Sequence, residues 1–178
     1  MRDLHSLLLP GESVWIFGEG HSRLPGLSFG RTIECLQMVL DESVPVAAPT
    51  ADIVRLGEAH SGEMVKLTEL AFPGFFRPKT HETGTYYGVR SNRELIAMGG
   101  ERLALNGYSE ISGVCAHPAH RGRGFAGNLM RQLVVDHRAK GVISWLRVIS
   151  TNNTAIALYQ SIGFGIARAV TLTEVFRM

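Results

Sequence analysis

The stretch from Arg121 to Ala126 (RGRGFA) combines two arginines with two glycines directly before an amphipathic segment. Glycine lets the backbone come close to a ligand because it has no Cβ, and the free N–H groups of a first helical turn attract anions. Arginine side chains add charge-assisted hydrogen bonds to phosphate oxygens. These residue types in this order predict a loop that binds a pyrophosphate group.

Three other interpretations of this loop must be weighed. Gly122, Gly124 and Gly127 satisfy the dinucleotide pattern G-x-G-x-x-G, but that pattern needs a tight strand-to-helix turn and a downstream acidic residue. Here His117–Arg121 separates the expected strand from the glycines, and no acidic residue ends the next expected strand. A nucleotide-binding P-loop would need Lys and then Ser or Thr after the glycines. For a lone glycine loop, a solvated basic turn would be the default.

A second pattern downstream makes the loop part of a larger constellation. Residues 152–164 read NNTAIALYQSIGF, with Asn152, Ala155 and Tyr159 at helical spacing. In order and distance, the form R-x-x-G-x-A and this segment resemble two motifs of the GNAT superfamily of acyl-CoA-dependent N-acyltransferases. Residues 110–118 (EISGVCAHP) also resemble the branch that includes the C-terminal domains of glycine N-acyltransferase-like proteins. The resemblance covers about residues 52–178.

This resemblance implies that acetyl-CoA is the cosubstrate and that no metal is needed. In the family, the strand before the loop splays from the strand after the helix, and the pantetheine arm lies in the gap. Backbone groups that the splay leaves unpaired are then satisfied by pantetheine amides, and one N–H polarises the thioester carbonyl. The implied cofactor-binding residues are Val114, Cys115, Ala116, Arg121, Gly122, Arg123, Gly124, Phe125, Ala126, Asn152, Ala155 and Tyr159.

Acyl transfer to an amine needs a proton acceptor for the amine and a proton donor for the leaving thiolate. Glu110 is the candidate base, directly or through water, because its distance from Arg121 matches the carboxylate base of some family members. Tyr159 lies where the family places the general acid. A structural carboxylate and a packing tyrosine are the alternatives. We therefore expect an N-acetyltransferase (EC 2.3.1 type) in which a primary amine attacks directly in a ternary complex, with a non-catalytic acyl-CoA-binding module as the alternative.

Other conspicuous residues support weaker hypotheses. Cys115 is more simply a small apolar filler than a nucleophile. His117 and His120 would need a third ligand to hold a metal, and none is indicated nearby. The basic loop alone does not indicate a nucleic-acid binder, because no wider basic stripe or interleaved aromatic residues accompany it.

Composition limits the class of protein. A length of 178 residues suffices for one domain with a core, and a formal net charge of +2 does not by itself indicate nucleic acid. Two cysteines form no disulfide framework or zinc set, and neither a signal peptide nor a membrane helix is indicated. We expect a cytoplasmic protein without nucleic-acid or membrane partners, with monomer and homodimer both open. The acceptor, a small-molecule amine or a peptide or protein amine, would bind near Phe72–His81, Leu95–Leu105 and the C-terminal strands.

The elements that must position these residues follow from periodicity and turn signals. Asn106-Gly107 predicts a type I′ hairpin turn. In the strand that follows it, alternation places Glu110, Ser112 and Val114 on one face unless a bulge intervenes. We expect strands at Ile53–Leu56, Tyr86–Arg90, Leu95–Leu105, Tyr108–Ala116, Val142–Ile149, Phe164–Ala167 and Ala169–Phe176, and helices at Ser61–Leu70, after Gly124 up to Gly141, and from Asn152 or Asn153 to Ile162.

The first half of the chain has weaker secondary-structure signals. Ser13–Phe17 and Ile33–Leu40 are expected strands, separated by a loop from Gly18 to Gly30, and Pro45–Thr50 has the composition of a linker. We therefore divide the chain into residues 1–50, strands packed on the core, and residues 51–178, a GNAT-like acyl-CoA-binding catalytic domain. The expected fold class is α/β (α+β by arrangement), with a mixed, mostly antiparallel sheet, splayed central strands and flanking helices.

Overall fold

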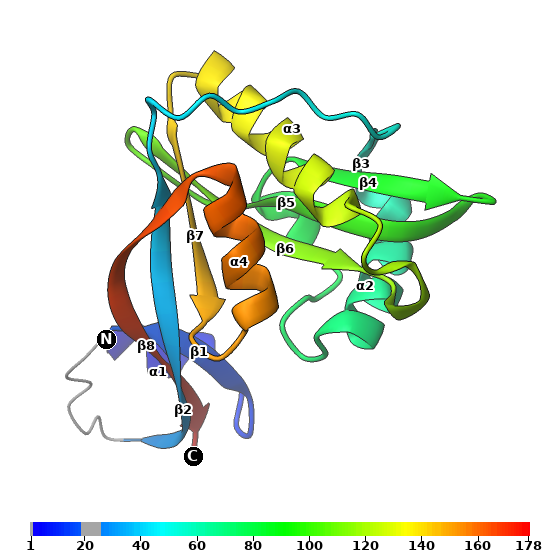
Figure 1. Ribbon diagram of the computed structural model, residues 1–178. Helices are drawn as coiled ribbons and strands as arrows, with labels where there is room; N and C mark the ends of the chain where they lie inside the picture. The colour runs from blue at the N-terminus through cyan, green and yellow to red at the C-terminus, as the bar shows by residue number, and fades with distance from the viewer. Residues whose placement is uncertain (1, 19–25) are drawn as a thin grey trace.

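The computed structural model describes residues 2–18 and 26–178, which form one mixed sheet with helices on both faces (Figure 1). Among these residues the sheet has eight strands in the order β1-β8-β2-β7-β6-β5-β4-β3. Neighbouring strands are antiparallel except β6 and β7, which are parallel. The predicted fold class is therefore confirmed. The strands are β1 (Ser13–Phe17), β2 (Leu27–Leu40), β3 (Val54–Leu56), β4 (Tyr86–Ser91), β5 (Glu94–Leu105), β6 (Tyr108–Ala116), β7 (Ile143–Ile149) and β8 (Phe164–Arg177).

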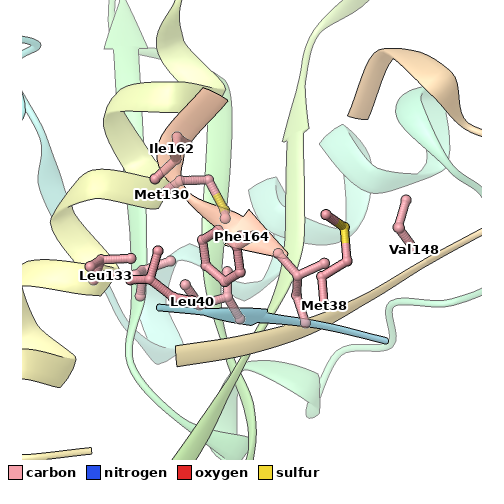
Figure 2. Close-up of a cluster of buried hydrophobic side chains, with 10 residues drawn as sticks. Met38, Leu40, Met130, Leu133, Val148, Ile162 and Phe164 are labelled. Carbon is pink, nitrogen blue, oxygen red and sulfur yellow. The ribbon is translucent and has the colours of Figure 1, made fainter. Parts of the chain in front are cut away.

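Helices cover both faces of this sheet. On one face, Met130, Ile162 and Phe164 belong to a buried cluster that joins α3 and α4 to the central strands (Figure 2). On the other face, Met64 and Leu67 of α2 pack in a second cluster against β4, β5 and β6. None of the described helices is long and apolar enough to cross a membrane. The helices are α1 (Arg2–Leu7), α2 (Ser61–Ala71), α3 (Phe125–Ala139) and α4 (Asn153–Ile162).

The elements expected after residue 51 are present, with small shifts at their ends and two exceptions given below. The Asn152 side chain caps α4, since its Oδ1 accepts a hydrogen bond from the Ala155 N–H at 3.2 Å. Gly163 ends α4 in the left-handed region, with φ of 111°. Local signals of this kind depend on a few neighbouring residues, which explains why the sequence located both ends of the helix.

The type I′ turn was assigned to the wrong hairpin. Asn106-Gly107 does join β5 to β6, but only Gly107 has a positive φ, of 78°, whereas a type I′ turn needs two such residues. Asn92 and Arg93, in the turn between β4 and β5, have φ of 48° and 69°. The pair of left-handed residues therefore lies one hairpin earlier, at a turn without glycine.

Two expected strand boundaries were also wrong. β2 begins at Leu27, inside the loop expected from Gly18 to Gly30; residues 19–25 of that loop lie outside the described residues. β8 is one continuous strand where two were expected. A bulge lies at the expected break, because Gln37 pairs with Arg168 whereas Met38 pairs with Ile166. Pairing with β2 before and after the bulge keeps the strand continuous.

The first fifty residues supply two strands to one half of the sheet. β2 lies between β7 and β8, and β1 lies at the edge beyond β8. Residues 45–50 have no regular structure, as expected, and their chain crosses α3 (Figure 1). There the Asn128 Oδ1 accepts hydrogen bonds from the Thr50 and Ala51 N–H groups at 2.6 and 3.2 Å.

A buried polar network joins α3 to β5 and β7. His137 lies 2.8 Å from the Ser144 hydroxyl through Nδ1 and 2.9 Å from Glu101 through Nε2. Burial lowers the pKa of His137, so the neutral ring donates from Nε2 and accepts at Nδ1. Burial opposes ionisation of Glu101, but the Thr85 N–H and Lys140 outweigh it and lower the pKa of Glu101 to about 2.

Candidate active site

The active-site candidate begins where β6 and β7 stop pairing. Their parallel ladder runs only from Tyr108 opposite Ile143 to Ile111 opposite Leu146. Beyond that point β6 pairs with β5 alone and β7 with β2 alone, and the two strands diverge (Figure 1). The splay expected between these two strands is therefore present, and it leaves one side of each strand without a backbone partner.

A bulge in β6 changes which side chains face this gap. Met98 pairs with Cys115 and Gly100 with Ser112, so two residues, Gly113 and Val114, lie opposite a single residue of β5. Gly113 has φ of 65°, which favours glycine. After the bulge, Val114 packs with the cluster beneath α3 and α4, whereas Cys115 packs with the α2 cluster.

The bulge corrects one expectation from alternation. Glu110 and Val114 do not share a face of β6, because the inserted residue reverses the alternation between them. The Glu110 side chain pairs with arginines of β5 and β7, while Val114 is directed toward α3. The shared face was expected only if no bulge intervened, and this condition is not met.

A cavity of about 850 Å³ connects the splay with the loop before α3. All the residues expected to bind the cofactor line it, from Val114–Ala116 through Arg121–Ala126 to Asn152, Ala155 and Tyr159. Glu110 does not line it. A single connected space therefore joins the two sequence motifs and the splayed strand.

At one end of the cavity the loop has the geometry of an anion cradle. Gly122 and Gly124 have φ of 75° and 77°. A Cβ added at Gly122 would meet nothing within 4 Å, and one at Gly124 only the Asn128 side chain at 4.0 Å. The first-turn N–H groups of α3 have no acceptor within the helix. This open, positively polarised surface fits the pyrophosphate of coenzyme A.

The arginines of the loop are close to these N–H groups. The Arg123 Nη1 donates to the His120 Nδ1 at 2.9 Å, and its guanidinium lies 5.1 Å from the Phe125 ring centre. Arg121 and Arg123 are both exposed. Both line the cavity, and no carboxylate of the described residues pairs with either. Their charge is available to an anionic ligand.

Tyr159 and Cys115 also line the cavity. Burial raises the pKa of the Tyr159 phenol to about 12 and that of the Cys115 thiol to about 12. Both groups are therefore protonated at neutral pH. Among the described residues the Tyr159 hydroxyl has no hydrogen-bond partner, so its proton is available. A protonated, buried thiol at Cys115 is poorly suited to nucleophilic attack.

Glu110 lies beside the cavity, under two arginines. Its side chain is 1% exposed. Arg102 donates to Oε1 at 2.7 Å and to Oε2 at 3.2 Å, and Arg147 donates to the same two oxygens at 3.0 and 3.1 Å. An ionised carboxylate has about four acceptor positions, so all are filled. Burial alone would raise the pKa of Glu110, but the two arginines outweigh it and hold this pKa below its ordinary value.

Comparison with known proteins places this geometry in a family. The family model described as FR47-like protein matches residues 86–172. N-alpha-acetyltransferase RimI of Mycobacterium tuberculosis is 32% identical over 127 residues, covering 69% of this chain and 79% of that protein. A crystal structure of a putative acetyltransferase from the GNAT family, from Novosphingobium aromaticivorans, has a TM-score of 0.90 and 36% identity, covering 98% of this chain and 79% of that one.

The chain belongs to the GNAT family of acetyltransferases. The ribosomal-protein-S18-alanine N-acetyltransferase of Escherichia coli has a TM-score of 0.60 at 20% identity, covering 71% of this chain and 94% of that one, and shares the fold. Membership of the family makes acyl transfer the general activity. The narrower resemblance to glycine N-acyltransferase-like proteins stays a prediction.

Three residues of this GNAT site were missed in the sequence. Arg102, Arg147 and Phe17 line the same cavity, at the end where β6 and β7 are still close. One signal for Arg147 was available, since it is the only charged residue in the mostly apolar β7. Phe17 had no such signal, because it reaches the site from the N-terminal edge strand.

Residues from each region expected to form the acceptor pocket line the cavity. Of the regions expected to form it, Phe72 and Phe75, Arg102 and Leu172 line the cavity. They come from the segment after α2, from β5 and from β8. Binding of the acceptor by these residues stays a prediction.

Proposed function

We propose that this protein transfers an acetyl group from acetyl-CoA to a primary amine, by direct attack in a ternary complex. The observation that carries this proposal is the continuous cavity from the glycine loop to the β6–β7 gap, lined by every residue expected to hold the cosubstrate. The loop N–H groups, Arg121 and Arg123 would hold the pyrophosphate, and the backbone of Val114–Ala116 the pantetheine arm. Bound acetyl-CoA supplies an activated thioester carbonyl.

The chain's own groups would then assist one displacement. The amine nitrogen bonds to the carbonyl carbon and the carbon–sulfur bond breaks. A backbone N–H of β6 near the bulge polarises the carbonyl, a contribution of about 2.7–4 kcal/mol in comparable sites. Tyr159, protonated because of its raised pKa, gives its proton to the departing sulfur. The tyrosine regains a proton from solvent.

The amine also loses a proton, and two routes are open to it. Glu110 can take it through a bridging water, as the sequence indicates, or solvent can take it directly. The four arginine hydrogen bonds and the lowered pKa of Glu110 favour the solvent route. Reactivity should then follow the neutral fraction of the amine.

Two relatives narrow the acceptors worth testing. One is named an N-alpha-acetyltransferase, and the Escherichia coli protein of the same fold acts on the alanine of ribosomal protein S18. A small amine and a peptide α-amine therefore both belong in the first panel. We also propose a cytoplasmic location, supported by Cys35 and Cys115, which are both free thiols.

A thermal-shift assay followed by a thiol-release assay tests the proposal. Acetyl-CoA at about 100 times its Kd should stabilise the protein by roughly 2.7 kcal/mol, which for this chain length is about 5–10 °C in Tm. Thiol release should then depend on an added amine. No shift would contradict cosubstrate binding. A shift without amine-dependent release from any small or peptide amine would favour a non-catalytic acyl-CoA-binding module.

A further inference from the structure

Two arginines at the closed end of the gap have donors to spare. Each guanidinium carries five N–H donors, and Arg102 and Arg147 each use their Nε and Nη2 groups on Glu110. In the part of the chain that the structure describes, neither Nη1 group has a hydrogen-bond acceptor. Both side chains line the cavity. The acceptor positions of Glu110 are thus all filled, whereas the two Nη1 groups can still donate to a ligand in the cavity.

The charge of the cavity is one-sided. Four arginines line it, and no Asp or Glu of the described residues does. Arg121 and Arg123 belong to the pyrophosphate end. The other two lie near Leu146, the last residue of β7 that pairs with β6. With Glu110 counted, two positive charges and one negative charge leave a net +1 at this end.

Aromatic contacts hold these arginines in place. The guanidinium of Arg147 lies 3.5 Å from the Phe17 ring centre and 4.8 Å from that of Trp145, and that of Arg102 lies 5.8 Å from Phe17. The Arg147 side chain is only 13% exposed. A charged group with a fixed orientation in a poorly hydrated place binds an oppositely charged ligand with little reorganisation.

We propose that the acceptor is an amine that carries a carboxylate, of the amino-acid class, and that Arg102 and Arg147 bind this carboxylate. The inference rests on the proposed acetyl transfer and assigns the acceptor side of the same cavity. Glu110 then acts as a positioning residue, because it holds both guanidinium groups side by side. Phe72 and Phe75 supply an apolar wall for the side chain of the acceptor.

Binding of the reaction product tests this without requiring turnover. N-acetyl-L-phenylalanine and N-acetyl-L-phenylalaninamide differ only in the carboxylate, and each is titrated by calorimetry into the protein saturated with coenzyme A. The acid should bind about 10- to 100-fold more tightly than the amide, as expected for charge-assisted hydrogen bonds. Equal affinities would overturn the proposal.

Substitutions test whether the two arginines cause the preference for the acid over the amide. Arg147→Gln and Arg102→Gln should each reduce the preference for the acid at least several-fold, whereas Arg168→Gln, an exposed arginine outside the cavity, should preserve it. Arg102, with a side chain 37% exposed, can be replaced with less risk to folding than Arg147. Retained coenzyme A binding confirms that each variant is folded. An undiminished preference in folded Arg102→Gln would overturn the assignment.

Kinetics separate this proposal from acetyl transfer itself. With L-phenylalanine and L-phenylalaninamide as acceptors, Glu110→Gln should raise KM for the acid more than KM for the amide, because positioning of the arginines affects the carboxylate. An equal fall in kcat for both would make Glu110 the base instead. Preference for the acid product without any thiol release would contradict the proposed transfer but not this site. Thiol release with amines or peptides but no preference for the acid would contradict this site but not the proposed transfer.

Discussion

Two pairs of arginines line the two ends of one cavity, and they are held in different ways. Arg121 and Arg123 lie exposed on a glycine loop, where left-handed backbone and the start of α3 present N–H groups to an anion. Arg102 and Arg147 project from strands and are held by a buried carboxylate and aromatic rings. At the first end the backbone forms the site. At the second end it consists of side chains alone.

The difference has a consequence for how each end tolerates change. A backbone site is altered mainly by substitutions that fill its space or add like charge. A side-chain site with a buried ion at its centre is sensitive to the loss of any one partner, because the remaining charge stays buried without compensation. The loop end should therefore respond in ligand binding, and the arginine end in stability as well as binding.

Tyr159→Phe should have the largest effect, because Tyr159 lines the cavity and serves the reacting atoms in the proposed displacement. Loss of the proton donor should lower kcat by about 10²- to 10⁴-fold. Acetyl-CoA binding, measured by thermal shift, should fall far less than kcat, since the pyrophosphate loop Arg121–Ala126 is not altered. A variant with wild-type kcat would show that solvent protonates the departing sulfur.

Gly124→Glu should come next, with acetyl-CoA binding weakened by more than about 100-fold through like charge at the pyrophosphate site. Gly141→Glu is a matched control. It adds the same side chain at φ of 66°, compared with 77° at Gly124, also into open space, and it lies beyond the other end of α3. Isothermal titration should show normal binding in the control. Equal weakening in both would mean that strain, and not the anion site, explains the loss.

Glu110→Gln should destabilise the protein by about 3 kcal/mol, as expected when one partner of a buried ion pair is removed. Arg123→Gln at the loop end and Glu94→Gln at the exposed start of β5 should each stay within about 0.5 kcal/mol. Urea unfolding at pH 7 measures all three. A Glu110 variant as stable as the Glu94 control would show that the carboxylate does not hold the arginines together.

Lowering the pH should reduce the difference in unfolding free energy between the parent and Glu110→Gln. This is the smallest and most gradual effect expected. The folded pKa of Glu110 lies below its ordinary value of 4.5, so its contribution is complete above that pH and is lost as the pH falls toward the folded value. The stability gap between the parent and Glu110→Gln should therefore be constant near neutrality. Below pH 4.5 it should shrink by at most about 1.4 kcal/mol per pH unit. A gap that grows in acid would contradict the lowered pKa.

His137 and Glu101 make the parent itself acid-sensitive, and this effect has the same sign. The pKa of each is lowered in the folded protein, that of Glu101 to about 2, so the unfolded chain binds more protons below the ordinary values of 6.5 and 4.5. Because both residues are present in the parent and in the variant, their contributions cancel in the stability gap. The gap therefore reports on Glu110.

The sequence was most informative where a few consecutive residues decide the outcome. The capped helix at Asn152, the glycine loop at Gly122 and Gly124, and most strands after residue 51 were predicted from local signals. The two wrong strand boundaries, at Leu27 and within β8, have a different cause. Both depend on pairing with strands far away in the chain, which extends a strand beyond its own hydrophobic pattern.

By itself, the sequence determined the loop, the caps and the presence of two motifs at a spacing typical of the family. These features depend on φ preferences, side-chain caps and helical periodicity, which act over a few residues. Only the tertiary structure decided what surrounds Glu110. Arg102 is 8 residues away and Arg147 is 37 residues away in the chain, and Phe17 arrives from an edge strand of the sheet. Strand order and register brought them together, and no local propensity encodes either.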